Sequence, residues 1–390
     1  MIPVEAALDA LFALTRVMPV EEVPLRAAAG RILARDVTAR RTQPPFAASS
    51  MDGYALRRAE VEPDAMFKVI GEAAAGHSFA GTVKAGQAVR IFTGAPIPDG
   101  ADFVVIQEDT TRRGDLITLG HRIGPKDNIR PAGGDFAKGQ RLAAPQRLRP
   151  ADIALMAAMN IPEVPVFARP DVAIIATGDE LVQPGDTPGP NQIIASNNYG
   201  LAAQLEAMGA RARLIPIARD TPAALTRAFE LAQGADLVIT IGGASVGDHD
   251  LVAPVAAELG MEQSFYKVAM RPGKPLMAGR LGETMMIGLP GNPVSALVCG
   301  TVFVAPVIRA MQGLAQTAAP RRHMPLAVDI AANGPREHYM RARITDAGVI
   351  PAERQDSSLL TVLASADVLL VRPKDAPAQP KGTLVEVIDL

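Results

Sequence analysis

The chain has 390 residues, of which 48% are hydrophobic, 39 are Lys or Arg and 41 are Asp or Glu, and its formal net charge is −2. This length predicts two to four domains with sizeable cores, and the near-neutral charge argues against a general nucleic-acid binder, which is usually strongly basic. Cys299 is the single cysteine, which excludes a disulfide framework.

The N-terminal segment predicts a helix, because Val4, Leu8, Leu11 and Phe12 recur at the spacing of one helical face. It contains acidic residues and no basic leader, so we expect no secretory signal. From about residue 43 to residue 130, glycines and prolines separate short β-rich runs, and a second helix is expected after Pro150. A β-rich segment between two helical ones predicts a domain inserted into a discontinuous one.

The next part of the chain alternates between strands and helices. Ser196 and Thr221 are expected to cap two helices, and Gly209 to end the first of them. The pattern is β-α-β-α-β, which is typical of a doubly wound parallel sheet with ligands at the carboxyl ends of its strands. We expect strands at 171–181, 213–217 and 237–241, and helices at 197–208 and from 222 onward.

The sequence DLVITIGGASVGDHD joins a buried strand to a glycine-rich loop. Gly242, Gly243 and Gly247 allow tight turns that aim backbone N–H groups at an anion, and the helix that follows adds the positive end of its dipole. Asp248 and Asp250 suit a divalent cation that bridges phosphates, because such ions are held by one or two carboxylates. The alternative is an ordinary connection in which the glycines only turn the chain.

Two further polar turns follow predicted strands. One is TGDE, which includes Glu180. The other is LPGNP, in which Asn292 is expected to cap a helix and Pro293 to occupy its first turn. Because the three turns all lie at carboxyl ends of strands, we expect them to share one pocket. The long uncharged run after Pro293 contains Ser295 and falls short of about 20 wholly apolar residues, so we expect a core helix, no membrane span and a cytoplasmic protein.

A basic loop, KVAMRPGKP, places Lys267, Arg271 and Lys274 within nine residues. Most short basic clusters are solvated turns. Here prolines stiffen the backbone, and a cation on a rigid loop loses less entropy when it meets an anion. We therefore favour an anion-binding loop beside the expected phosphate cradle.

In chain order, GGASVGDHD, KVAMRPGKP and LPGNPVSAL resemble the molybdopterin-binding domain of molybdenum cofactor biosynthesis proteins. PPFAASSMDGYA, RIFTGAPIPDG and IRPAGGDFAKG resemble N-terminal signatures of the molybdopterin molybdenumtransferases, a family similar to the E domain of gephyrin. The resemblance spans nearly the whole chain. It implies an α/β multidomain protein with a helical dimerisation domain at 1–46 and 131–168, an inserted β-rich domain at 47–130, a doubly wound molybdopterin-binding domain at 169–318 and a C-terminal β-barrel at 319–390.

This family inserts molybdenum from molybdate into adenylylated molybdopterin and releases AMP. The resemblance implies the same transferase activity in a homodimer that works with Mg²⁺ and meets the molybdopterin adenylyltransferase as a further partner. It implies catalytic acids at Asp52, Glu180 and Asp250, and Mg²⁺ ligands at Asp52, Asp248 and Asp250. The implied substrate-binding residues are Thr93, Asp135, Gly242, Gly243, Ser245, Gly247, Lys267, Arg271, Lys274, Pro290, Gly291 and Asn292.

The sequence departs from the family pattern at several positions. Arg271 stands where the family usually has lysine, so the charge is kept while the donor geometry changes. Gly134 stands where a glutamate is common, and Ala47 and Ala48 replace an Asp-Asn pair. QDSSLL resembles a serine-rich turn of the family, but Asp356 and Ser358 stand where small residues or glycine are usual. Ser357 is the candidate there, and a structural role is favoured over ligand binding.

Two other classes of function remain open. One is a different enzyme on the same α/β domain, such as a molybdopterin adenylyltransferase or a nicotinamide-nucleotide amidase. The MDGY and FTGA motifs count against it. The other is a non-catalytic scaffold like the gephyrin E domain, and the lack of a long linker counts against that reading.

Overall fold

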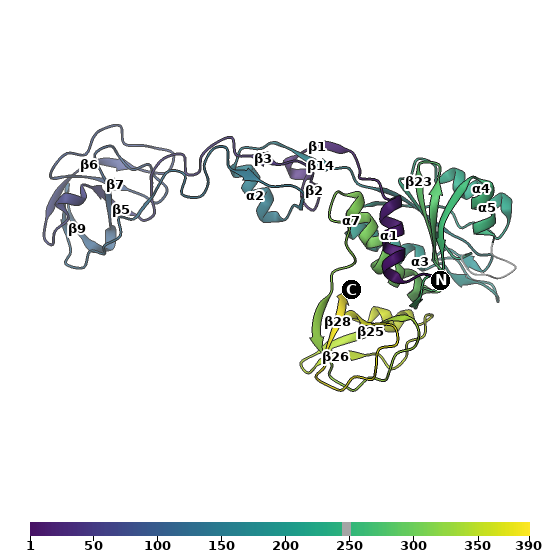
Figure 1. Cartoon of the computed structure of the whole chain (residues 1–390). Coiled ribbons are helices and arrows are strands. Elements are labelled where there is room, and N and C mark those ends of the chain that lie inside the picture. Colours follow the sequence, from purple (N-terminus) through teal and green to yellow (C-terminus); the bar gives the residue numbers. More distant parts are fainter. Residues whose placement is uncertain (244–250) are drawn as a thin grey trace. The chain divides into compact units, whose positions relative to one another are not determined.

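The computed structural model describes residues 1–243 and 251–390 (Figure 1). The chain forms two compact units. Unit 1 comprises Met1–Glu21, Gly30–Ala34 and Val166–Leu390, and unit 2 comprises Glu22–Ala29 and Arg35–Pro165. Neither unit is therefore one continuous stretch of sequence.

Unit 2 is built around a six-stranded sheet with the order β8-β5-β7-β6-β10-β9. Its strand β5, which lies between β8 and β7, is buried on both faces, because Tyr54 and Leu56 belong to one hydrophobic cluster and Ala55 to another. This burial fixes the backbone that immediately precedes β5, where Asp52 lies. The strands are β5 (Gly53–Leu56), β6 (Met66–Ala73), β7 (Gln87–Ile91), β8 (Phe103–Ile106), β9 (Thr110–Arg113) and β10 (Leu116–Leu119).

Short elements complete unit 2. The helix α2 (Pro150–Ala158) begins with a side-chain cap, since Asp152 accepts a hydrogen bond from the Arg149 backbone N–H at 2.8 Å. The other elements are β3 (Val37–Thr38) paired with β12 (Arg141–Leu142), β4 (Ala48–Ser49) paired with β11 (Ile129–Arg130), β13 (Gln146–Arg147) and the 3₁₀ turns η1 (Leu25–Ala27), η2 (Arg58–Glu60) and η3 (Gln107–Asp109). The strands β1 (Val20–Pro24), β2 (Ile32–Leu33) and β14 (Glu163–Phe167) lie where the chain passes from one unit to the other.

Unit 1 contains a second six-stranded sheet, with the order β18-β15-β19-β23-β22-β20. The first four strands are parallel, and β22 and β20 continue the sheet in antiparallel pairing. The parallel part confirms the predicted doubly wound arrangement. The strands are β15 (Asp171–Ala176), β18 (Arg211–Leu214), β19 (Leu237–Ile241), β20 (Met261–Tyr266), β22 (Met277–Leu281) and β23 (Thr284–Leu289).

Helices cover both faces of this sheet (Figure 1). On one face, α4 (Pro222–Leu231) and α5 (Val252–Glu258) pack together. On the other, α1 (Val4–Leu14), α3 (Asn197–Ala207) and the helical segment after Pro293 share a large core. The N-terminal helix thus packs on the α/β sheet, whereas the predicted ranges grouped it with residues 131–168.

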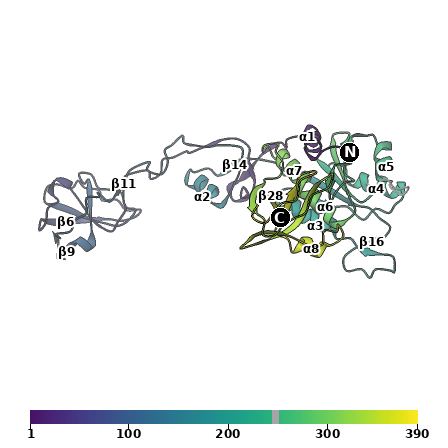
Figure 2. The same ribbon diagram turned by 60° about the horizontal axis from the view of Figure 1, so that its bottom comes forward.

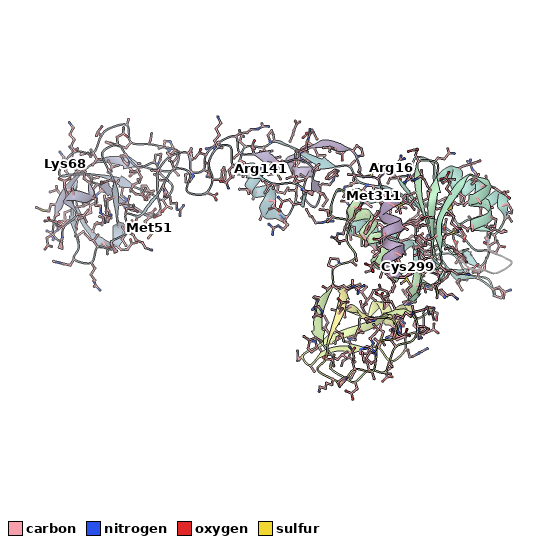
Figure 3. All side chains as sticks on the ribbon, in the orientation of Figure 1. Arg16, Met51, Lys68, Arg141, Cys299 and Met311 are labelled. Atoms are coloured by element: carbon pink, nitrogen blue, oxygen red, sulfur yellow. The ribbon has the colours of Figure 1, made fainter. Side chains whose placement is uncertain are left out.

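One long helical segment runs through the core of unit 1. It consists of α6 (Pro293–Cys299), the π-helical turn η4 (Gly300–Val304) and α7 (Ala305–Met311). Its length and composition match a membrane span, yet 89% of its most apolar window is buried inside the protein, as expected of a core helix. Figure 3 labels Cys299 and Met311 on this segment. Cys299 is fully buried, and this burial raises the pKa of its thiol, so the side chain is an inert apolar group.

The C-terminal residues form a second sheet of unit 1, with the order β21-β25-β27-β28-β24 and with β26 beside β25. The strand β21 (Met270–Arg271) comes from the basic loop and pairs in parallel with β25, so that Arg271 lies opposite His338. The other elements are β24 (Arg322–Pro325), β25 (Glu337–Thr345), β26 (Gly348–Pro351), α8 (Leu360–Ala364), β27 (Val368–Arg372) and β28 (Leu384–Asp389).

Local predictions met different outcomes. Thr221 caps α4 as predicted, since its Oγ1 accepts from the Ala224 N–H at 3.3 Å, and Gly209 ends α3 with φ of +95°. The prediction for Ser196 is wrong. Its side chain makes no capping bond to α3, and its Oγ donates to Asn197 Oδ1 at 3.3 Å. The strand expected at 171–181 ends at residue 176, because the polar TGDE turn begins there.

Candidate functional site

A cavity of about 640 Å³ lies at the carboxyl ends of β15, β19 and β23 in unit 1. All three polar turns predicted at strand ends contribute to it. The turn after β15 supplies Thr177, Gly178 and Glu180, the turn after β19 supplies Gly242 and Gly243, and the turn after β23 supplies Pro290, Gly291 and Asn292. We call this the strand-end cavity. Parallel strands of a doubly wound sheet bring their carboxyl ends to one edge, which explains the convergence.

Two residues of this cavity require glycine. Gly242 and Gly243 have φ of +95° and +59°, a region that L side chains rarely adopt. A Cβ on Gly242 would lie 2.8 Å from the Thr177 carbonyl oxygen, and one on Gly243 would collide with Val252. The bare backbone is therefore needed for close approach, either of the neighbouring strand or of a ligand.

The start of α3 also lines the strand-end cavity, through Ser196, Asn197 and Asn198. Asn197 Nδ2 donates to the Gly291 carbonyl at 2.7 Å and so ties this helix to the turn after β23. Asn198 is only 2% exposed, and its Oδ1 has no hydrogen-bond partner within the described structure. Figure 2 shows the segment of β16 (Leu181–Val182), which pairs with β17 (Ile193–Ile194), projecting from the α/β domain beside this region.

A second cavity of unit 1, of about 320 Å³, is positively charged, and we call it the basic cavity. Arg271 and Lys274 of the basic loop line it together with Arg336, which precedes β25. The pairing of β21 with β25 brings these cations together although more than 60 residues separate them. Pro275 and Asn292 line both cavities, so the strand-end cavity and the basic cavity adjoin.

Two buried side chains of β25 lie close to the cations of the basic cavity. Arg341 has no exposed surface, and its Nε and Nη1 find no partner among the described residues. Its Nη2 donates to the Asp356 carbonyl at 3.0 Å. His338 is 7% exposed, and burial, followed by the charges of Arg271 and Arg341, lowers its pKa to about 4. It is therefore neutral at pH 7. Asp356 also lines the basic cavity, and the charge of its exposed carboxylate partly offsets that of Arg341.

The turn that presents Ser357 to the basic cavity is held by Gln355. Gln355 accepts from the Arg341 N–H at 3.0 Å and donates to the carbonyls of Arg341 and Ala352 at 2.9 and 2.8 Å. The Ser357 carbonyl in turn accepts from the Val294 N–H in α6 at 3.1 Å. The turn is thus fixed both to β25 and to the helix that begins between the two cavities.

In unit 2, Asp52 and Thr93 form a separate polar corner. Asp52 Oδ1 accepts hydrogen bonds from the backbone N–H and from the hydroxyl of Thr93, both at 2.8 Å. These bonds, the backbone one first, hold the pKa of Asp52 below its usual value, and the charge of Arg90 adds a smaller effect in the same direction. Figure 3 labels Met51, which immediately precedes this corner. The carboxylate is therefore ionised and oriented.

A third cavity, of about 360 Å³, lies elsewhere in unit 2. Asp135 and Arg130 line it with Gly134, one of the departures from the family pattern. The segment is fixed by backbone bonds from Asp135 and Phe136 to the Gln43 carbonyl at 3.1 and 3.2 Å.

Comparisons with known proteins agree with this architecture over its whole length. Three family models match the chain. They are the MoeA N-terminal region (domain I and II) at residues 2–160, a probable molybdopterin binding domain at 173–310, and the MoeA C-terminal region (domain IV) at 323–390. A molybdopterin molybdenumtransferase of Nostoc sp. is 41% identical over 335 residues, which cover 82% of this chain and 76% of the relative. The chain belongs to the molybdopterin molybdenumtransferase family.

Other members cover the chain even more completely. Molybdopterin molybdenumtransferase 2 of Mycobacterium tuberculosis is 36% identical over 384 residues, 94% of each chain. The crystal structure of the molybdopterin biosynthesis moeA protein of Pyrococcus horikoshii OT3 covers 100% of both chains with a TM-score of 0.85 at 26% identity. The multidomain α/β architecture is thus that of the family.

Not every residue that the family resemblance singled out lies beside a cavity. Lys267 lines neither cavity of unit 1 and stands over the Tyr266 ring at 4.8 Å, with φ of +68°. Ser245, Gly247, Asp248 and Asp250 lie outside the described residues.

The residues that the structure describes do not show a magnesium site. Among them no group of three His, Cys, Asp or Glu side chains is placed to hold a metal ion. Mg²⁺ needs only one or two carboxylates when phosphates supply further ligands. Asp52 fits that requirement, because both hydrogen bonds from Thr93 reach Oδ1 and leave Oδ2 for another ligand.

Sequence reasoning missed several residues of the site. Arg336, His338 and Arg341 were not candidates, because no motif links them to the basic loop. Asn198 was overlooked as well. Its position in the first turn of a helix at a strand end is a signal that could have found it.

Proposed function

We propose that this chain inserts molybdenum from molybdate into adenylylated molybdopterin and releases AMP. The observation that carries the proposal is the adjacency of two cavities that share Pro275 and Asn292. The strand-end cavity is lined by glycine backbone and by the first turns of helices, which suit an extended organic anion. The basic cavity is lined by cations, which suit a small oxyanion. The reaction needs two such anions side by side.

The strand-end cavity would hold adenylylated molybdopterin. Backbone N–H groups in positive-φ turns and at helix starts favour phosphate oxygens, which supports a pyrophosphate position beside Gly242 and Gly243. Within the same proposal, Ser245, Gly247, Pro290, Gly291 and Asn292 contribute to this cradle, and Glu180 supplies a carboxylate at its rim.

The basic cavity would hold molybdate. A doubly charged oxyanion gains Coulomb energy from Arg271, Lys274 and Arg336 and relieves the unfavourable field around buried Arg341. Ser357 adds a hydroxyl donor at the same wall. Lys267 remains a proposed cation of this loop, although its described position is over Tyr266.

Asp52 and Asp250 are proposed as catalytic acids with Glu180, and Thr93 and Asp135 as substrate-binding residues. Asp52, Asp248 and Asp250 are each proposed as carboxylates for Mg²⁺, which when bound would neutralise charge on the phosphate oxygens. Asp52 is held as an oriented anion by Thr93, which suits either role. The family resemblance supports a homodimer, a cytoplasmic location, a helical dimerisation domain, a C-terminal β-barrel and an encounter with the molybdopterin adenylyltransferase.

The test mixes the protein with adenylylated molybdopterin, molybdate and Mg²⁺ and measures AMP. We expect AMP release that requires molybdate and yields the molybdenum dithiolene product. ATP consumption with molybdopterin alone would instead indicate an adenylyltransferase. Absence of AMP release from protein that binds both substrates would contradict the proposal.

A further inference from the structure

Arg90 in unit 2 is held rigidly between two aromatic rings. It lies on β7 directly opposite Tyr54 on β5. Its guanidinium carbon is 5.1 Å from the centre of the Tyr54 ring and 4.6 Å from the centre of the Phe92 ring. Stacking of this kind fixes the plane of the guanidinium, so its N–H groups point in set directions.

Those N–H groups close a network around the peptide between Asp52 and Gly53. Arg90 Nη1 donates to the Gly53 carbonyl at 3.1 Å, and Nη2 donates to Gln107 Oε1 at 2.6 Å. The Gln107 backbone N–H then donates to the Asp52 carbonyl at 3.0 Å. One guanidinium therefore holds the backbone on both sides of the Asp52–Gly53 bond.

The same guanidinium also contacts the residue that precedes Thr93, the partner of Asp52. Phe92, on which Arg90 stacks, immediately precedes Thr93, and both hydrogen bonds to Asp52 Oδ1 come from Thr93. Arg90 thus connects the segment that carries the carboxylate to the segment that orients it.

We propose that Arg90 is a positioning residue that sets the direction of the Asp52 carboxylate relative to Thr93. The inference rests on the proposed role of Asp52 in molybdenum insertion. A lysine at this position would keep the charge but could not donate along two fixed directions or stack as a plane. The arginine fork is therefore the feature that matters.

The test uses the full chain with Arg90→Lys and measures AMP release over a range of adenylylated molybdopterin concentrations. We expect kcat to fall about tenfold while KM stays within about twofold, because a misplaced carboxylate harms the transition state more than substrate binding. Arg58→Lys is the matched control. Arg58 also stacks on a ring, at 5.3 Å from Phe103, but its hydrogen bonds go to Asp102 and Pro125. This control should leave kcat and KM unchanged.

A double-mutant cycle separates positioning from general support of the fold. In an Asp52→Asn background, Arg90→Lys should cause no further loss, because the group it positions is gone. An equal loss in both backgrounds, or no loss in the wild-type background, would overturn the proposal.

A second variant serves if Arg90→Lys lowers the melting temperature by more than about 5 °C. Gln107→Leu removes the acceptor of Arg90 Nη2 at an exposed position, and it should lower kcat about threefold. If the Asp52→Asn variant releases AMP at the wild-type rate, the proposed role of Asp52 itself is wrong. If the Asp52→Asn variant is inactive and the Arg90→Lys variant is fully active, only the proposed role of Arg90 is wrong.

Discussion

Asp52 in unit 2 is a solvent-accessible carboxylate whose Oδ1 already accepts two hydrogen bonds from Thr93. Arg341 in unit 1 is a fully buried guanidinium with two nitrogens that have no partner in the described chain. The corner around Asp52 is thus complete in the free protein. The surroundings of the basic cavity are not, because buried donors without acceptors destabilise the state that contains them.

This difference separates two ways of building a site. Unit 2 presents a charge that is oriented in advance by a rigid sheet, so its removal should affect turnover and leave folding alone. Unit 1 brings several cations together, and a bound oxyanion reduces their mutual repulsion. Binding of that anion should therefore stabilise the folded protein and change how its stability depends on pH. Substitutions in the two units should therefore have different consequences for turnover, binding and stability.

The largest effect is expected for Asp52→Asn. Asparagine keeps the size and the acceptor oxygen for Thr93 but removes the charge. We expect AMP release to fall at least about 100-fold, as for loss of a preorganised charge at a reacting centre, while the melting temperature changes by less than about 2 °C. Calorimetric melting and AMP release, measured on the same preparation, show whether turnover is lost while stability is kept. Activity near the wild-type level would place the essential charge elsewhere.

Lys274→Gln should weaken oxyanion binding by about 10- to 100-fold, the usual range for loss of a hydrogen bond to a charged group. Lys274 is exposed at the wall of the basic cavity, so folding of the free protein should be unaffected. The affinity of the wild type should fall as salt rises, and that of the variant should fall less. Titration calorimetry with molybdate at two salt concentrations measures both effects, and equal affinities for the two proteins would refute the cavity assignment.

His338 should make the free protein sensitive to mild acid. Its pKa is about 4 in the folded chain against a reference of 6.5, and the cations that face it are Arg271, Arg336, Arg341 and Arg372. Between those values the unfolded chain binds the proton and the folded chain does not, so stability falls as pH drops from 6.5 toward 4, by up to about 3 kcal/mol.

Molybdate should make this decline shallower, because an anion near His338 raises its pKa in the folded protein. Denaturant unfolding at a series of pH values, with and without molybdate, measures the effect. His338→Met should flatten the curve over the same interval. An equally steep curve for that variant would assign the acid sensitivity to other groups.

Gly243→Ala should cost about 1 kcal/mol of stability or more and weaken binding of adenylylated molybdopterin, because φ of +59° strains a residue with a Cβ and because that Cβ would collide with Val252. Gly291→Ala is the matched control in the same cavity. Its φ lies outside the strained region, and an added Cβ would meet only the Gly242 Cα, at 3.5 Å. Equal losses in the two variants would show that neither the positive φ of Gly243 nor the contact of its added Cβ with Val252 explains the effect.

The smallest change is expected for Arg271→Lys. If the basic cavity attracts molybdate by charge alone, its affinity should stay within about twofold of the wild type. A loss as large as that of Lys274→Gln, measured by the same titration, would mean that the guanidinium of Arg271 makes a directional contact.

The sequence predicted the basic loop and the glycine turns, because charge clusters and glycines in turns are local signals. It did not predict that Arg271 would lie opposite His338. That register depends on the two-residue strand β21, which is too short to leave a pattern. Buried strands such as β19 were recognised from continuous apolar runs, and residues 237–241 were predicted with the observed bounds.

In unit 2 the motifs identified Asp52 and Thr93 separately. Their contact arises from the antiparallel pairing of β5 with β7, in which Gly53 lies opposite Ile91. Sequence patterns report which residues are buried or flexible along one segment. They do not report strand register across a sheet, and here register creates both the Asp52 corner and the basic cavity.

The binding of molybdate in the basic cavity is tested most directly by a crystal soaked with molybdate and measured near the molybdenum absorption edge. We expect an anomalous peak in the basic cavity, in contact with Arg271, Lys274 and Arg336 and adjoining the strand-end cavity at Pro275 and Asn292. A peak beside Asp52 and Thr93 with none in the basic cavity would contradict this expectation.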